Sequence, residues 1–341
     1  MYLAVAGIIL SALVLLDLIY TAFSSLGAGF ITKWVSQTTW KFLLFLSKSL
    51  RVPKLMNLAG LIIVCITLLQ WVFLTWIAHV LIAVSDDYSI VNSNTKAPTG
   101  LLEKIYVTGY NLSTLGNGDY MGGSPMWKLF FPIGAFTGLI MVTVALTYLI
   151  QVFSNVNGKR NFSSYVSGLG NTPEDLLLNA WNGKDFSALN NHLLQLNKQL
   201  SAIHHNHMSF PVLHFYYSSD EKTSVPVTVS ILDEAITILN THVQKEVCPD
   251  ALTMQLTRNT VTDFLSTLNK GFIKPSDAAQ PSPQLSKLER RNVPLQKNES
   301  DTNNANNLRK RRELLLGFLE DEGRDWTSVY GKPKADKTGS V

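Results

Sequence analysis

The sequence predicts an all-α membrane protein whose membrane part is followed by a mainly helical cytosolic domain. In a chain of 341 residues, the three long apolar segments all lie before residue 154, and the sequence behind them is largely polar. The formal charge of +4 is small, and the basic residues lie beside the apolar segments instead of forming one stripe. This pattern favours contact with lipid and argues against nucleic acid as a partner. The two cysteines are too few for a disulfide framework.

Each apolar segment is long enough for a membrane-spanning helix, which needs about 20 apolar residues. The first covers residues 1–24 and is interrupted by Asp17, the second begins at residue 56, and the third is expected over residues 126–153. A cleaved signal peptide is the alternative for the first segment, but no basic region leads it, and we expect it to stay attached. Asp17 is either a functional acid within the membrane or a paired structural one.

Residues 30–52 connect the first two spans and are too mixed in character to be a further span. Aromatic residues such as Trp34 and Phe45 alternate there with Lys33 and Lys41. This pattern is typical of an amphipathic helix in the headgroup region of a bilayer. An ordinary connecting helix in the cytosol is the alternative.

The loops predict the direction of the chain, because short cytoplasmic loops are enriched in Lys and Arg. The loop after the first span is basic and contains no acid, and Lys159 and Arg160 follow the third span. The loop after the second span carries Asp86 and Asp87 instead. We therefore expect a multi-pass protein of the cell membrane, with its N-terminus outside and its C-terminal domain in the cytosol.

A short helix and a glycine-containing loop are expected between the second and third spans. Residues 101–113 are helical in character but too few to cross a bilayer. Irregular backbone at membrane depth is tolerated where it lines a water-filled cavity. Glycine reaches positive φ without steric cost, so alternating glycines let successive carbonyl groups turn towards one axis. The loop that follows the helix consists of Thr114, Leu115, Gly116, Asn117, Gly118 and Asp119.

These residues resemble the signature of the pore-loop potassium channels, which reads Thr-Val-Gly-Tyr-Gly-Asp. Thr114, Gly116, Gly118 and Asp119 match it at their positions, and the resemblance covers residues 56–153. It is closest to bacterial channels with one pore loop per chain, here with an extra N-terminal span. The resemblance implies a pore helix at 101–113, a selectivity filter at 114–119 and an inner helix at 126–153.

Two positions depart from that signature. Leu115 replaces a valine, and Asn117 replaces an aromatic residue that, in the family, packs behind the filter and supports its diameter. On the inner helix, Gly134, Thr137 and Gly138 are candidates for a hinge or for the lining of the pore. Thr137 and the threonines that follow it either face the pore axis or bond back to their own helix.

The resemblance implies passive conduction of potassium, or of another monovalent cation, through a homotetramer in the bilayer. A weakly selective cation channel is one alternative, favoured by Asn117. The other is a membrane receptor or scaffold that keeps the pore fold without conducting. No catalytic residues or cofactor are predicted, and the sequence specifies no cytosolic ligand.

The cytosolic domain is expected over residues 160–272. Thr172-Pro-Glu-Asp175 predicts the start of a helix. A narrow apolar seam between Phe186 and Ile203 follows, which either pairs subunits or packs within one domain. Short strands are expected at 210–217 and 225–229, and helices at 232–247 and 252–268. A metal site built from His204, His205, His207 and His214 is disfavoured, because no cysteine or acid accompanies them at a regular spacing.

The C-terminal sequence divides into two parts. Residues 273–307 are rich in Pro, Ser and Asn and predict a disordered linker. Residues 308–341 begin with Arg309-Lys-Arg-Arg312 and continue into an apolar run, which predicts a basic amphipathic tail. That tail either binds anionic lipid or docks on the soluble domain, and everything beyond Lys274 is expected to be dispensable for assembly.

Overall fold

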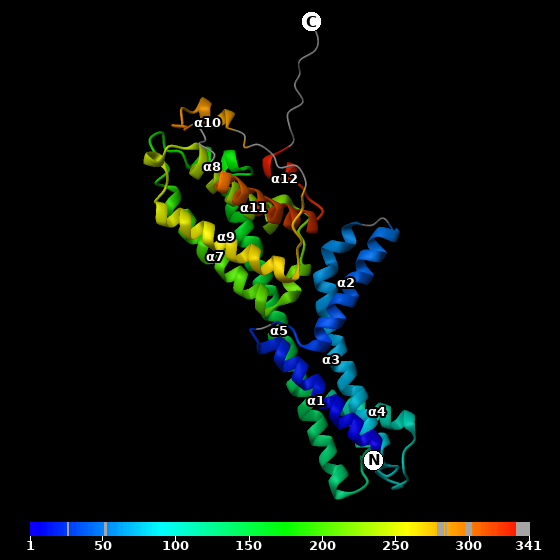
Figure 1. Cartoon of the computed structure of the whole chain (residues 1–341). Helices are drawn as coiled ribbons and strands as arrows, with labels where there is room; N and C mark the ends of the chain where they lie inside the picture. Colours follow the sequence, from blue (N-terminus) through cyan, green and yellow to red (C-terminus); the bar gives the residue numbers. More distant parts are fainter. Residues whose placement is uncertain are drawn as a thin grey trace. The chain divides into compact units, whose positions relative to one another are not determined.

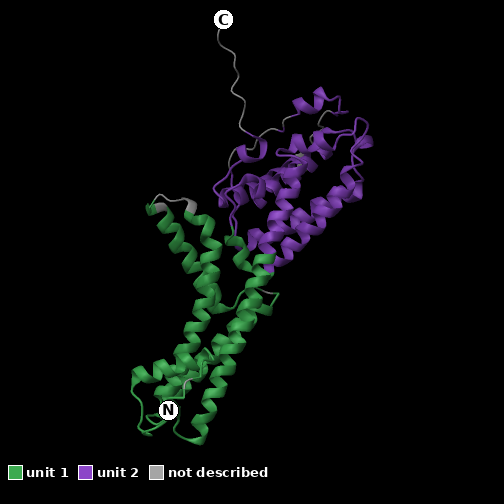
Figure 2. Ribbon diagram, turned by 180° about the vertical axis from the view of Figure 1, so that it is seen from behind, with its two compact units in different colours: residues 1–154, 209–216 green, residues 155–208, 217–341 purple. Residues whose placement is uncertain are grey.

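The protein consists of two compact units in the computed structural model (Figures 1 and 2). Residues 1–25, 27–50, 53–116, 118–277, 283, 285–296 and 302–331 are described. Unit 1 comprises residues 1–154 and 209–216, and unit 2 comprises residues 155–208 and 217–341. The helix α5 begins in unit 1 and continues without interruption into unit 2.

Unit 1 contains the apolar helices and a small two-stranded sheet. Its elements are α1 (Tyr2–Phe23), α2 (Phe30–Leu50), η1 (Pro53–Leu58), α3 (Ala59–Val84), β1 (Ile90–Asn92), α4 (Leu101–Leu112), β2 (Tyr120–Gly122), the first part of α5 (Pro125–Leu169) and η2 (Pro211–Phe215). Three described helices are long and apolar enough to cross a membrane, namely Tyr2–Phe23, Leu55–Val84 and Pro125–Leu169. The expected spans are therefore present as helices, and the third continues 16 residues beyond its expected end.

A glycine lets α1 and α3 approach closely. A β-carbon at Gly7 would lie 2.6 Å from the carbonyl oxygen of Ala78 and 2.7 Å from a side-chain carbon of Ile82. Within a bilayer the hydrophobic effect does not drive helices together, so they associate by close packing. Small residues permit that packing because the two backbones can approach each other. Farther along α3, Trp71 is buried and packs edge-on against Tyr148 of α5.

Asp17 joins the first three helices through hydrogen bonds. Its carboxylate accepts from the backbone N–H of Ile31 at 2.8 Å, the hydroxyl of Thr32 at 2.6 Å and the indole N–H of Trp71 at 3.0 Å. Ile31 and Thr32 lie in the first turn of α2, so the carboxylate also satisfies helix N–H groups that have no partner within α2. The contacts favour the structural interpretation of this buried acid.

We predict that Asp17→Ala lowers the unfolding free energy by about 3 kcal/mol or more, because several donors lose a charged acceptor. Asp17→Asn keeps one acceptor oxygen, so its unfolding free energy is expected to lie between that of Asp17→Ala and that of the unmodified protein. Thermal unfolding of the full chain in detergent, followed by tryptophan fluorescence, measures the difference. Leu16→Ala, at an exposed neighbouring position, is the control. Equal melting temperatures for Asp17→Ala and the unmodified protein would contradict the prediction.

Unit 2 is built around one central helix. Its elements are the last part of α5, then α6 (Pro173–Ala180), α7 (Leu189–Ser209), η3 (Glu221–Thr223), α8 (Val225–His242), η4 (Lys245–Val247), α9 (Ala251–Gly271), α10 (Ser286–Arg290), α11 (Thr302–Asp321) and α12 (Thr327–Tyr330). Every residue of α8 from Val225 to Leu239 is buried. The helix expected from Thr172 is confirmed as α6, and Thr172 caps it by accepting from Asp175 N. The expected helix at 252–268 is α9.

The apolar seam of α7 packs inside unit 2. Its members are buried in one core cluster with residues of α8, α9 and α11; they are Phe186, Leu189, Leu193, Leu196, Leu200 and Ile203. The seam therefore stabilises one domain, which was one of the two alternatives for it.

The expected strands at 210–217 and 225–229 were wrong. Residues 211–215 form the 3-10 helix η2, and Val225 begins α8, seven residues before the helix start that the sequence indicated. Alternation of Val with Thr and Ser imitates a strand that has one polar face. In the buried helix, the polar residues bond to the preceding turn instead: Thr228 Oγ1 donates to Ser224 O and Ser230 Oγ to Pro226 O. All faces of α8 can therefore be covered.

The C-terminal segment also differs from the expected linker and tail. Residues 286–290 form α10, and Leu295 makes a β-bridge with Val243. The apolar residues of α11 belong to the unit 2 core; they are Leu315, Leu316, Phe318 and Leu319. Of the two alternatives for the tail, the structure favours docking on the soluble domain.

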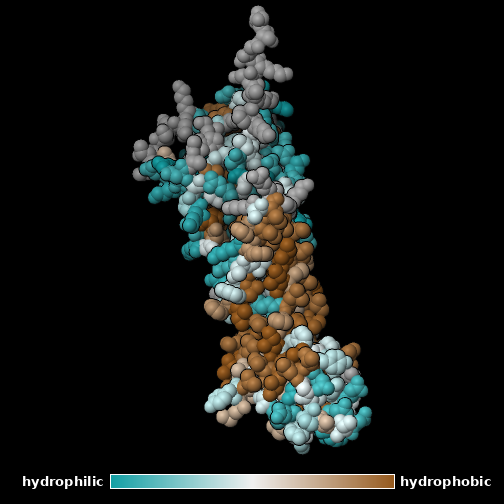
Figure 3. All heavy atoms as spheres, turned by 90° about the vertical axis from the view of Figure 1, so that its right-hand side faces the viewer, coloured by the Kyte–Doolittle hydropathy of each residue, from teal (hydrophilic) through white to brown (hydrophobic). Residues whose placement is uncertain are grey.

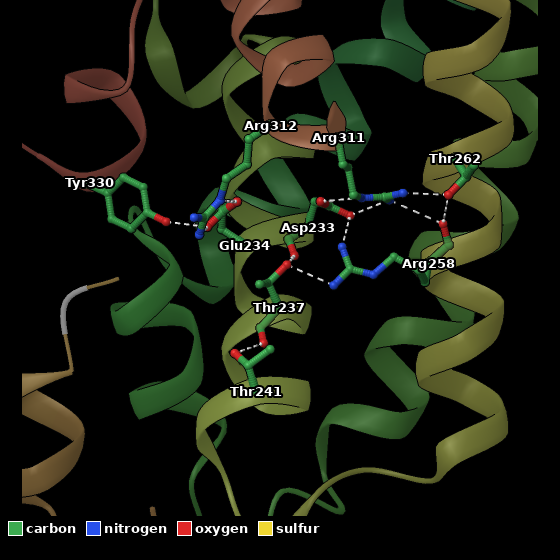
Figure 4. Close-up of polar contacts among 9 residues, drawn as sticks. All are labelled: Asp233, Glu234, Thr237, Thr241, Arg258, Thr262, Arg311, Arg312 and Tyr330. Carbon is green, nitrogen blue, oxygen red and sulfur yellow. Dashed lines mark hydrogen bonds and ion pairs between the residues drawn. The ribbon is translucent and has the colours of Figure 1, made fainter. Parts of the chain in front are cut away.

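Two arginines of α11 pair with buried acids of α8 (Figure 4). Arg311 Nε and Nη2 donate to Asp233 at 2.7 and 2.5 Å, and Arg312 Nε and Nη2 donate to Glu234 at 2.8 and 2.5 Å. Asp233 is 1% exposed and Glu234 is fully buried. Burial opposes ionisation of Asp233, but Arg258 and Arg311 together hold the pKa of Asp233 below its usual value. The sequence predicted that residues beyond Lys274 are dispensable for assembly. Because Arg311 and Arg312 pair with buried acids, we instead expect loss of these residues to destabilise unit 2.

We predict that Arg312→Gln destabilises unit 2 by about 3–5 kcal/mol, because it leaves a buried carboxylate without its cation. Arg309→Gln on the same helix is the matched control. The side chain of Arg309 is 62% exposed and pairs with Asp277 and Glu313 at the surface, so the loss of these pairs is expected to cost about 1 kcal/mol or less. Urea unfolding of the full chain in detergent measures both changes, and similar effects from the two variants would show that burial of the pair is unimportant.

Candidate functional site

The short helix α4 is held by polar contacts with the segments around it. The indole N–H of Trp76, on α3, donates to Ile105 O at 3.1 Å. The buried Lys104 donates from Nζ to Asp86 O at 2.6 Å, and Glu103 accepts from Gly100 N at the start of the helix. These bonds hold both the first turn and the middle of α4, and its bounds agree with the short helix expected at 101–113.

The carboxyl end of α4 lies against two glycines of α5. A β-carbon at Gly134 would be 2.3 Å from Asn111 Nδ2, and one at Gly138 would be 1.8 Å from Leu112 O. The sequence nominated both glycines as a hinge or as pore lining, and the structure places both beside the end of α4. Thr137, between them, donates from its hydroxyl to Ile133 O at 2.8 Å, so the alternative of bonding back to its own helix is confirmed. Thr143 and Thr147 do the same.

The loop after α4 contains two left-handed residues separated by one position. Thr114 has φ +60° and Gly116 has φ +62°. Positive φ is unusual for a β-branched residue and often marks functional backbone. Backbone N–H groups of Thr114 and Leu115 still donate into the last turn of α4, to Asn111 O and Tyr110 O. The side chain of Leu115 is 74% exposed. Asn117 lies outside the described residues.

The other end of the loop is fixed to the small sheet. Gly118 O accepts from Ser93 Oγ at 2.6 Å, and Asp119 O accepts from Ser93 N at 2.9 Å. The next residues form β2, which pairs antiparallel with β1 in the register Ile90 to Gly122. Sequence reasoning missed Ser93, because a serine 25 positions away gives no local signal. The positive φ of Thr114 also had no signal, since threonine is not a residue that favours it.

The loop stands in a negative electrostatic environment. The negative end of the α4 dipole points towards Thr114. Asp86, near the start of α4, accepts from the Tyr88 N–H and the Trp127 indole, and these bonds hold the pKa of Asp86 below its usual value. The helix dipole favours a cation over an anion beside this backbone.

The four histidines considered for a metal site do not lie together. His204 is bonded through Nε2 to Thr267 Oγ1 and stacks on His205, and His207 packs edge-on against Phe272. His214 belongs to unit 1, whereas the other three belong to unit 2. Within the described ranges, no group of three or more His, Cys, Asp or Glu side chains is placed to hold a metal ion.

The chain is 34% identical over 323 residues to the uncharacterized membrane protein YdjJ of Bacillus subtilis (strain 168), covering 94% of each sequence. The chain belongs to the YdjJ family. This relationship, together with the three apolar helices, makes it a mostly helical membrane protein. No protein-family model matches the sequence, and no solved structure gives a significant match.

In this member of the YdjJ family, the candidate site consists of backbone more than side chains. Its exposed groups are the described residues of the loop between α4 and β2, among them Leu115 and Asp119. Carbonyl oxygens are ligands for hard cations and have no nucleophilic role. Backbone of this kind can therefore bind a cation.

We predict that Gly138→Ala disturbs the site more than Gly134→Ala. The new methyl group at 138 meets the backbone carbonyl of Leu112, which cannot move without shifting α4, whereas at 134 it meets the flexible end of Asn111. We expect a loss of about 1–3 kcal/mol for Gly138→Ala and less for Gly134→Ala. Thermal unfolding in detergent measures the order.

Gly158→Ala is the matched control, because nothing lies within 4 Å of a β-carbon there on the same helix. It should leave stability unchanged or raise it by about 0.5–1 kcal/mol. If Gly138→Ala behaves like Gly158→Ala, α4 does not pack on α5 as described.

Proposed function

We propose that the protein conducts monovalent cations passively, potassium first among them, as a homotetramer in the membrane. The observation that carries the proposal is the short helix α4, which ends at a loop with alternating left-handed residues, Thr114 and Gly116. Both ends of this loop are held, by α4 on one side and by Ser93 on the other. A loop fixed at both ends can present its carbonyl groups in a constant geometry.

Several copies of the loop are needed to surround an ion. One chain supplies one loop, and closed rotational symmetry with four copies would produce rings of carbonyl oxygens that replace the hydration shell of the ion. The loop faces open space within one chain: nothing lies within 4 Å of a β-carbon built at Gly116 or Gly118. That open space is where the loops of other copies would stand in the proposed tetramer.

The surface of unit 1 supports a position within lipid. On the face shown in Figure 3, apolar surface covers the helices of unit 1, and polar surface gathers at the end that carries α4 and its flanking loops. Large apolar side chains exposed on α5 include Phe136, Leu139 and Ile150. Lipid and neighbouring subunits would cover them. The proposed topology has the N-terminus and α4 loop outside and unit 2 in the cytosol, following the basic loops.

The helix α2 fits the headgroup region in this arrangement. Its exposed aromatic residues, Phe30, Trp34 and Phe45, lie on the same helix as the exposed Lys33 and Lys41. Aromatic rings and lysines prefer the boundary between water and hydrocarbon.

Weak ion selectivity is the second candidate, because Asn117 replaces the aromatic residue of the potassium-channel signature. The two candidates differ in one measurable quantity. The reversal potential of the reconstituted protein under mixed potassium and sodium gives the permeability ratio. A non-conducting scaffold would give no flux in any cation gradient while remaining assembled.

We predict that Gly116→Ala abolishes cation flux into liposomes without preventing insertion or assembly. A β-carbon at positive φ costs roughly 1–2 kcal/mol in each copy, and four copies would concentrate that strain around one axis. Gly183→Ala is the matched control: Gly183 also has positive φ and open space, but lies in unit 2. Normal flux from Gly116→Ala, or equal loss from both variants, would argue against this loop as the filter.

We also predict that Asn117→Tyr raises the preference for potassium over sodium. The aromatic ring restores the residue that supports the filter in the resembled family. The shift of the reversal potential under mixed ions measures it, with Leu115→Val as a variant that restores the signature at the other departing position without adding a ring. An unchanged potential in assembled Asn117→Tyr protein would count against the assignment.

A further inference from the structure

A cavity of about 400 Å³ with a mixed polar and apolar lining lies within unit 2. Three regions distant in sequence form its walls: the end of α5, the stretch from the loop at 219 through η3 into the first turns of α8, and the chain after α11. Its volume falls in the lower part of the range usual for small-molecule sites. None of the features that support cation conduction lies here.

Two cations on this cavity have spare capacity for an anion. Lys222 is exposed and makes no ion pair with any described residue. The side chain of Arg324 is 12% exposed, and its Nη2 donates to Ser218 O at 2.7 Å. Its nearest approaches to carboxylates are long, 3.5 Å to Glu221 and 3.5 Å to Glu322, against the 2.7–2.9 Å of a strong charged hydrogen bond.

The two acids on the cavity accept hydrogen bonds from neutral donors and keep their negative charge. Asp220 Oδ1 accepts from Lys222 N at 3.0 Å, where it caps η3. Glu221 Oε1 accepts from Ser328 Oγ at 2.9 Å. Hydroxyl groups of Ser167 and Ser219 add neutral polar partners, and Val227 adds an apolar surface. The cavity therefore offers two cations, two carboxylates that already accept hydrogen bonds, neutral hydrogen-bonding groups and an apolar side to one ligand.

We infer that this cavity binds a small organic anion, with Lys222 and Arg324 holding its phosphate or carboxylate group. Ser167 belongs to the last turn of α5, and its hydroxyl donates to Lys222 O at 2.9 Å. A ligand held by Lys222 and Arg324 joins the end of α5 to the chain after α11. The site is independent of whether unit 1 conducts ions.

Binding is tested on the full chain in detergent by isothermal titration calorimetry. Inorganic phosphate and succinate are the two probes, each compared with potassium chloride at equal ionic strength. We expect at least one probe to bind with a dissociation constant of about 1 mM or lower. Binding of phosphate alone identifies a phosphate ester as the ligand class, and binding of succinate alone identifies a carboxylate.

Lys222→Gln should raise the dissociation constant of the probe about tenfold, which corresponds to about 1.4 kcal/mol for one charged hydrogen bond. This side chain is exposed, so the variant keeps the fold even if Arg324→Gln does not. Lys198→Gln, at an exposed lysine of α7, is the matched control and should bind as the unmodified protein does.

Hydrogen exchange locates the bound probe. Slower exchange is expected in residues 165–171, 218–224 and 324–328 when the probe is added. The inference is overturned if neither probe binds, if Lys222→Gln binds as tightly as Lys198→Gln, or if the protected amides lie elsewhere.

Discussion

Polar groups that leave water need partners, and this requirement acts on both units of the chain. In unit 1, the carboxylate of Asp17 lies among apolar helices and is satisfied by the first turn of α2 and by Trp71. In unit 2, Asp233 and Glu234 lie on the central helix and are satisfied by arginines from α9 and α11. In each case a buried acid determines which distant segment must pack beside it.

The same requirement explains why the loop after α4 can be irregular. Its backbone is bonded to the last turn of α4 at one end and to Ser93 at the other. The glycines at 134 and 138 permit the end of α4 to lie close to α5. Under the proposed function, the constraint that stabilises the fold also exposes the groups that bind the ion.

Unit 2 depends on long-range ion pairs more than the composition of its C-terminal sequence suggests. Arg311 and Arg312 belong to a basic cluster that, in isolation, resembles a lipid-binding tail. Their partners lie 78 positions earlier, on a helix with no exposed residue from Val225 to Leu239. The continuous helix α5 is shared by both units, and the cavity at its end gives a small anion access to that helix.

The sequence by itself determined the three apolar helices, the short α4 helix and the loop at 114–119, because length, hydropathy and glycine spacing are local properties. Local capping chemistry likewise located α6 at Thr172. Only the tertiary structure decided that Asp17 is a structural acid, that Gly134 and Gly138 receive the end of α4, and that α11 completes the core of unit 2. Each of these depends on a partner far away in the chain. Val225–Val229 are helical for the same reason. The helix is buried on all sides, so it has no polar face, and without a polar face the sequence shows no helical periodicity.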